Sequence, residues 1–115
     1  MVQGLGADAL LVQADLADLA DLNRMVDVTL ERFGRIDLLV NNAGVTLNKM
    51  FLDTQENDWD YVNNVNIKGT YLVTRAVIPH MVAAKYGKVV NISSCAGREG
   101  QAGLSIYAAS KFAVI

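Results

Sequence analysis

The sequence predicts an α/β fold, in which helices cover both faces of a parallel sheet. Three observations support it. Short apolar runs of strand length alternate along the chain with segments whose apolar residues recur at helical spacing. About half of the 115 residues are hydrophobic (52%), which is enough for a core. Small and polar residues follow the apolar runs, at the edge of a parallel sheet where ligands bind.

The first strand is predicted at residues 9–15 (ALLVQAD), ending at Asp15. A helix is predicted next, over residues 18–34, and Gly34 would end it as a C-cap. Its apolar residues recur at helical spacing, at Leu19, Leu22, Met25, Val26, Leu30 and Phe33.

The second strand is predicted at residues 36–40 (IDLLV), and the stretch NNAG (41–44) follows it. A long helix is then predicted from about residue 55 to residue 84, with Thr54 as its N-cap. Proline removes a helical hydrogen bond, so we expect a kink or break at Pro79.

The third strand is predicted at residues 86–93 (YGKVVNIS), followed by a glycine-rich loop over residues 94–103. A last helix begins near Ser105 or Ile106 and would still be running at Ile115. The three strands would place three segments at one edge of the sheet: Asp15 with Leu16, residues 41–44, and Ser93 with Ser94.

Composition excludes several classes of function. The net charge is −2 with no basic run, so nothing indicates a nucleic-acid partner. The longest apolar runs are far shorter than the ~20 residues that span a bilayer, and the N-terminus does not resemble a signal peptide. Cys95 is the only cysteine and His80 the only histidine, so we expect no disulfide and no metal site. These features are compatible with a cytoplasmic protein.

Tyr107 and Lys111 lie four residues apart in SIYAASK and share one face of the last predicted helix. A free phenol is a poor acid–base catalyst at neutral pH, and a nearby ammonium group favours its phenolate. Such a tyrosine can exchange a proton with an alcohol or carbonyl oxygen. The alternative is a chance pair on a solvated helix face, because this short motif alone is weak evidence.

Two serines end the third strand. Ser94 lies thirteen residues before Tyr107 and could bond the same substrate oxygen. Ser93 is the rival, because neighbouring strand residues point to opposite faces. Either hydroxyl could instead satisfy a local backbone group. The sequence around them, NISSCAG, is not a nucleophile elbow, so a serine hydrolase is disfavoured.

Two further stretches are candidates. In NNAG, Ala43 and Gly44 leave room for a ligand to approach the backbone, although the stretch also suits an ordinary turn. Asn66 lies inside the long helix, where asparagine is a mediocre helix former. Its amide could hold a water or an opened carbonyl, but from this residue alone a surface asparagine is the favoured interpretation.

Together, these signals resemble the short-chain dehydrogenase/reductase family in order and spacing. The similarity covers essentially the whole chain and includes GRIDLLVNNAG, WDYVNNVNIKGTYLV, GKVVNISSCAG and YAASKFAV. Within the family, it is greatest to 3-oxoacyl-carrier-protein reductases and related sugar or polyol dehydrogenases. The resemblance implies a Rossmann-like fold and an oxidoreductase that uses NAD or NADP to interconvert a carbonyl and a secondary alcohol.

The resemblance also implies roles for individual residues. Tyr107 would be the general acid–base, and Lys111 would favour its ionised form and hold the nicotinamide ribose. Ser94 would orient the substrate carbonyl, and Asn66 would anchor a water that relays protons from Lys111. The cofactor's adenine amine would bond Asp15, and its cleft would be lined by Asn42, Ala43 and Gly44, with Asn41 in a more structural role.

The chain departs from the family pattern at its start. Family members begin with a strand, a glycine-rich turn and a helix that binds the pyrophosphate. The stretch GLGADA (4–9) lacks the third glycine and precedes a strand, so it is not that turn. We therefore expect residues 1–115 to be a partial NAD(P)-binding Rossmann domain, an internal piece of a longer protein, with the residue that selects NAD or NADP lying upstream.

By itself the piece is expected to be inactive, marginally stable and aggregation-prone, because residues 9–15 lack their neighbouring strands. The intact protein is expected to act on a small carbonyl or alcohol substrate and to form a homodimer or homotetramer. The alternative is a catalytically inactive relative that serves as a binding or oligomerisation module.

Overall fold

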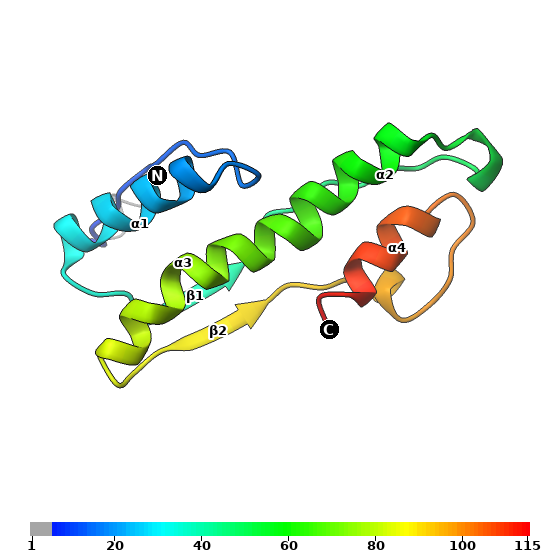
Figure 1. Cartoon of the computed structure of the whole chain (residues 1–115). Helices are drawn as coiled ribbons and strands as arrows, with labels where there is room; N and C mark the ends of the chain where they lie inside the picture. The colour runs from blue at the N-terminus through cyan, green and yellow to red at the C-terminus, as the bar shows by residue number, and fades with distance from the viewer. Residues whose placement is uncertain (1–5) are drawn as a thin grey trace.

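The computed structural model describes residues 6–115, so Gly4 of GLGADA lies outside the described residues. The main elements are the α-helices α1 (Leu19–Phe33), α2 (Glu56–Asn63), α3 (Thr70–Ala83) and α4 (Ser105–Phe112) and the strands β1 (Leu38–Asn41) and β2 (Lys88–Asn91). Three short helical turns join them: η2 (Phe51–Asp53), the π-helical η3 (Asn64–Gly69) and η4 (Cys95–Gly97). Figure 1 shows the two strands side by side along α3, and α4 beside η4.

Helix α1 forms as predicted. Its N-cap is Asp18, whose carboxylate accepts a 2.8 Å hydrogen bond from the Ala20 N–H. Gly34 ends the helix with φ of 78°, a left-handed conformation that favours glycine, and its N–H bonds the Leu30 carbonyl. The predicted C-cap is therefore confirmed.

The sheet of the described residues has two parallel strands, in register from Leu38 opposite Lys88 to Asn41 opposite Asn91. Parallel neighbours need a long crossover, which α2, η3 and α3 provide. Helix α3 packs on β1. Leu38 and Val40 remain 54% and 48% exposed, so the described residues leave uncovered sheet surface where the sequence predicted helices on both faces.

The core joins α1 to α3 and to the sheet. Val26 of α1 packs against Val77 and Met81 of α3, and all three are buried. Around this cluster lie the half-buried side chains of Leu30, Ile36, Leu39 and Ala76. The core therefore holds β1 in place, and with it the loop that begins at its carboxyl end.

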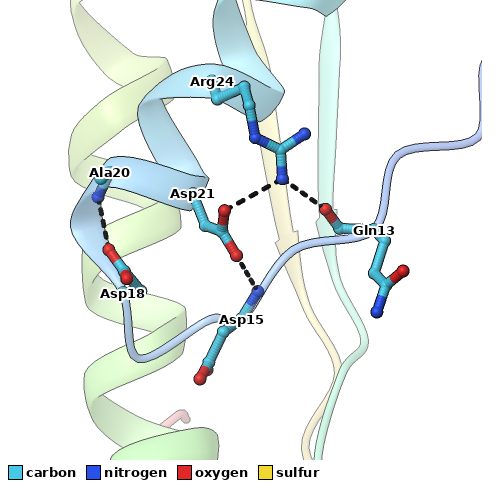
Figure 2. A network of polar contacts seen from close by, with 6 residues as sticks. All are labelled: Gln13, Asp15, Asp18, Ala20, Asp21 and Arg24. Atoms are coloured by element: carbon cyan, nitrogen blue, oxygen red, sulfur yellow. Dashed lines mark hydrogen bonds and ion pairs between the residues drawn. The ribbon is translucent and has the colours of Figure 1, made fainter.

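The first predicted strand, at residues 9–15, is wrong, because the segment is not a strand in the structure. A strand needs a neighbour to bond its backbone, and β1 and β2 pair only with each other in the described part of the chain. Side chains of α1 bond some of the backbone groups that a neighbouring strand would otherwise bond (Figure 2). The Arg24 guanidinium donates to the Gln13 carbonyl at 2.6 Å, and the Asp21 carboxylate accepts from the Asp15 N–H at 2.9 Å. Leu11 is fully exposed.

The long helix differs from its prediction in three details. It begins after Gln55 rather than Thr54, because the Asp58 carboxylate accepts from the Gln55 N–H at 3.0 Å. Helix α3 continues through Pro79 to Ala83, so no break occurs there. The irregularity lies instead at η3, where π-helical turns replace α-helical ones.

Helix α4 starts at Ser105 as predicted but ends at Phe112, so the expectation that it runs to Ile115 is wrong. The Ala113 N–H bonds the Ala109 carbonyl and closes its last turn. Among residues 6–115, no helix combines the length and apolar character that crossing a membrane requires.

Candidate active site

A cavity of about 280 Å³ lies where the loop after β1, the end of β2 and helix α4 meet. It is lined by Asn42, Gly44, Val45, Thr46, Ile92, Ser93, Tyr107 and Lys111. Four of these are residues that the sequence predicted as functional: Asn42, Gly44, Tyr107 and Lys111. The cavity opens at the carboxyl ends of the strands, the edge where parallel sheets bind ligands.

Helix α4 presents Tyr107 and Lys111 to this cavity, as their four-residue spacing requires. Tyr107 is half-buried, and its hydroxyl has no hydrogen-bond partner within residues 6–115. Lys111 is only 6% exposed, and its Nζ donates to the Ile92 carbonyl at 2.9 Å. An ammonium group has three N–H donors, so two remain for a ligand.

Gly44 fits closely between two site residues. A Cβ at this position would lie 3.2 Å from Asn66 Oδ1 and 3.3 Å from Lys111 Nζ. The backbone after β1 therefore lies so near the ammonium group that an added Cβ would fit only if a neighbouring atom moved by a few tenths of an ångström. The side chains of Asn66 and Lys111 therefore pack against bare backbone at residue 44. That a ligand approaches this backbone stays a prediction.

Asn66 connects η3 to the loop after β1. It is 1% exposed, and its amide pairs with both backbone groups of Val45: Oδ1 accepts from the Val45 N–H at 2.8 Å, and Nδ2 donates to the Val45 carbonyl at 2.9 Å. Its own main-chain carbonyl accepts from the Thr70 hydroxyl at 2.9 Å. The surface-asparagine interpretation of Asn66 is therefore wrong.

Ser110 was not among the residues predicted from the sequence. It is fully buried, its hydroxyl accepts from Asn66 Nδ2 at 2.9 Å, and it donates to the Tyr107 carbonyl at 2.7 Å. Its place three residues after Tyr107, on a buried side of the helix, was the available signal. Gly97 was also missed: a Cβ there would lie 2.8 Å from the backbone carbon of Lys111, so η4 packs directly on α4.

The two serines after β2 have different partners. The Ser93 hydroxyl lines the cavity and donates to the Lys111 carbonyl at 2.6 Å, so its proton is committed. The Ser94 hydroxyl accepts from the Ala96 N–H at 3.2 Å and has only a 4.0 Å contact to the Cys95 sulfur as a donor. Ser94 lines a neighbouring cavity of about 400 Å³, which Ser93 also lines.

The remaining predicted residues lie around the cavity. Asn41 is buried and donates at 2.9 Å both to Thr74 Oγ1 and to Asn91 Oδ1, which is the structural role predicted for it. Ala43 is exposed and does not line the cavity.

Asp15 lies outside the cavity, and its carboxylate accepts from the Ala17 N–H at 2.8 Å. The next residue, Leu16, packs close to η3, because a Cβ at Gly69 would lie 3.1 Å from the Leu16 Cβ. Beside this turn, the Asp15 N–H and then the Arg24 guanidinium hold the pKa of the Asp21 carboxyl below its usual value (Figure 2). In the described part of the chain, no three His, Cys, Asp or Glu side chains are grouped to hold a metal ion.

Comparison with known proteins decides the family. The sequence model of the short chain dehydrogenase family matches residues 1–115. The chain belongs to the short-chain dehydrogenase/reductase family. The parallel, Rossmann-like fold predicted from the sequence is thereby confirmed, with two strands rather than three in the described residues.

Among relatives of this chain, a 3-oxoacyl-[acyl-carrier-protein] reductase of Thermotoga maritima is 43% identical over 101 residues, or 88% of this chain and 41% of the relative. A short chain dehydrogenase/reductase of Burkholderia phymatum, solved in complex with NAD, matches with a TM-score of 0.93 and 34% identity over 98% of this chain and 41% of its own.

ElxO, solved with NADP bound, matches with a TM-score of 0.84 and 36% identity over 89% of this chain and 42% of its own. The chain therefore spans about two fifths of the length of these three proteins.

Proposed function

We propose that the protein carrying this chain is a NAD- or NADP-dependent oxidoreductase that interconverts a carbonyl group and a secondary alcohol. The proposal rests above all on one observation: the Tyr107 phenol and the Lys111 ammonium group line the same cavity beside Gly44. The substrate would be a small molecule, for which a 3-oxoacyl thioester is the first choice and a sugar or polyol the second. The Thermotoga relative is named for the first of these substrates.

The residues present fit the nicotinamide end of a dinucleotide. Lys111 is buried with one hydrogen bond, so two N–H groups can bond ribose hydroxyls. Burying a cation with so few partners costs free energy, which ribose hydroxyls would offset. At Gly44 no side chain separates a ligand from the backbone. The relatives that contain NAD and NADP support this assignment, without a choice between the two.

The chain's residues would act on protons and orientation. A bound nicotinamide supplies the hydride for the carbonyl carbon. The Tyr107 hydroxyl, which has no other partner among residues 6–115, would give its proton to the carbonyl oxygen and would recover it in the reverse direction. Lys111 would stabilise the phenolate that forms. Asn66 would anchor the water that relays protons from Lys111. It would bond this water through its main-chain carbonyl or Oδ1, because both N–H groups of its amide are already used.

Ser94 is the better candidate to orient the substrate oxygen. The Ser93 proton is committed to the Lys111 carbonyl, whereas the Ser94 hydroxyl has only a weak sulfur contact as a donor. We therefore expect Ser94→Ala to lower turnover more than Ser93→Ala does, when the two variants are compared under conditions where both are folded. If the two substitutions lowered turnover equally, the assignment of Ser94 would be wrong.

Residues 1–115 would then form part of an NAD(P)-binding domain of a cytoplasmic homodimer or homotetramer, with Asp15 near the adenine and Asn42, Ala43 and Gly44 along the cofactor cleft. The 115 residues by themselves should turn over no substrate, because they contain no turn of the G-x-G-x-x-G kind for the pyrophosphate. NADPH oxidation by the purified 115-residue polypeptide with a carbonyl substrate would overturn that part.

The test uses the full open reading frame that contains this sequence. NADH and NADPH consumption is measured with a 3-oxoacyl thioester and with a keto sugar. Tyr107→Phe should lower the rate at least ~100-fold, whereas Tyr61→Phe, on an exposed surface of α2, should leave it unchanged. A wild-type protein that consumes neither nucleotide with any carbonyl would instead favour the inactive binding module.

A further inference from the structure

We infer that Ser110 is a positioning residue that fixes the Asn66 amide and so holds the loop after β1 against the helix that carries Tyr107 and Lys111. The inference rests on the proposed function for its catalytic meaning. Its structural half rests on the side chains of Ser110 and Asn66, which bond each other and the backbone of Tyr107 and Val45.

The first step concerns the direction of the hydrogen bonds. Ser110 Oγ donates to the Tyr107 carbonyl at 2.7 Å, which commits its single proton. A helical serine commonly bonds a carbonyl of the preceding turn in this way, and that bond alone has no functional meaning. Because the proton is committed, Ser110 can only accept from Asn66, and it does so from Nδ2 at 2.9 Å.

The second step concerns the orientation of the amide. An asparagine amide can turn over and exchange its oxygen and nitrogen. With the nitrogen held by Ser110, the oxygen must face the Val45 N–H, which it bonds at 2.8 Å, and the second Nδ2 proton reaches the Val45 carbonyl at 2.9 Å. Ser110 is fully buried and Asn66 1% exposed, so water does not replace these bonds. The Val45 N–H and carbonyl already favour this orientation of the amide, and Ser110 reinforces it with a third bond, because its oxygen can only accept from Nδ2.

The third step leads to the cavity. Val45 follows Gly44, whose missing Cβ would lie 3.3 Å from Lys111 Nζ. The loop therefore lies close to the ammonium group, with which it lines one cavity, and a shift of the Val45 backbone changes the space around Lys111. Through Asn66, Ser110 ties the cavity-lining loop to the same helix that presents Tyr107 and Lys111. If the tie is removed, the two walls of the cavity can move independently.

The experiment compares Ser110→Ala with Ser105→Ala in the full open reading frame that contains this sequence. Ser105 lies on the same helix and is exposed, so it is a matched control. Two quantities are measured: hydrogen exchange of the Val45 amide, and the Kd of NADH and NADPH by fluorescence titration. Ser110→Ala should speed Val45 exchange and weaken cofactor binding by about tenfold, the factor that corresponds to about 1.4 kcal/mol, while Ser105→Ala changes neither.

Ser110→Cys serves if Ser110→Ala does not fold. A thiol is a weak donor and acceptor, so exchange and Kd should change in the same direction by a smaller factor. Unchanged Val45 exchange, or a loss of thermal stability with unchanged Kd, would overturn the role of Ser110. A wild-type protein that binds neither nucleotide would overturn the proposed function instead, and the exchange of Val45 would still decide the structural half of the inference.

Discussion

Gly44→Ala tests whether the loop after β1 and Lys111 are as closely packed as the structure has them. The added Cβ would lie 3.2 Å from Asn66 Oδ1 and 3.3 Å from Lys111 Nζ, both closer than an ordinary van der Waals contact. Asn66 is held by three hydrogen bonds and Lys111 Nζ by one, so the ammonium group should move by a few tenths of an ångström. Cofactor binding should therefore suffer more than folding.

The magnitude follows from overpacking, which costs about 1–3 kcal/mol in a filled interior. Because a lysine side chain can yield, we expect a loss near 1 kcal/mol in the free energy of unfolding and a Kd for NADH or NADPH raised about tenfold. Urea denaturation gives the first quantity and fluorescence titration the second.

Two glycines bracket the effect. Gly100→Ala adds a Cβ into open space and should change the free energy of unfolding by less than about 0.5 kcal/mol. Gly97→Ala brings its Cβ to 2.8 Å from the Lys111 carbonyl carbon, a backbone atom that cannot yield easily, so its loss of stability should exceed that of Gly44→Ala. If Gly44→Ala matched Gly100→Ala in both stability and Kd, the close approach to Lys111 would be refuted.

Three further predictions concern stability. Asn41→Ala should cost about 1–3 kcal/mol in urea denaturation, because two buried hydrogen bonds are lost, and an unchanged midpoint would contradict the structural role of Asn41. The Lys49 ammonium, and to a lesser extent the Gln55 N–H, hold the pKa of the Asp58 carboxyl below its usual value. The ionised carboxylate therefore stabilises the folded protein above about pH 4, and this stabilisation is lost as the pH falls through the lowered pKa. The thermal midpoints of the wild type and Asp58→Asn should differ at neutral pH and converge in acid. Leu22→Ala, at a fully buried position, should lower the free energy of unfolding in chemical denaturation by about 2–5 kcal/mol. Leu52 is 95% exposed, so a comparable loss in Leu52→Ala would contradict the assignment of Leu22 to the core.

Elements whose stability is local could be predicted from the sequence. Helix α1 follows from its apolar spacing and its left-handed cap at Gly34, both encoded within one segment. The stretch 9–15 has the composition of a strand, but a strand forms only beside a partner, and composition does not say whether one is present. The residues of this segment alone therefore could not show that it stays outside the sheet.

In the candidate site, too, the features set by local geometry could be predicted and those set by contacts distant in the sequence could not. The spacing of Tyr107 and Lys111 on a helix placed both at one cavity, because helix geometry alone determines their shared face. The π-helical turn η3 could not be predicted, because Asn66 makes its bonds to Val45 across 21 residues of chain. Ser110 was missed for a related reason: its hydroxyl has an ordinary local bond, and only the fold adds Asn66 as its second partner.

The most direct test of the central claim is deuterium transfer from NADH and NADPH, each labelled at nicotinamide C4, to a 3-oxoacyl thioester. The product of the full open reading frame that contains this sequence would be used, with the alcohol product analysed by mass spectrometry. We predict deuterium on the carbinol carbon with the wild type from at least one nucleotide, and essentially none with Tyr107→Phe. Label transfer by Tyr107→Phe at the wild-type rate would contradict the role of Tyr107, and no transfer by the wild type to this or any other carbonyl would contradict the proposed oxidoreductase.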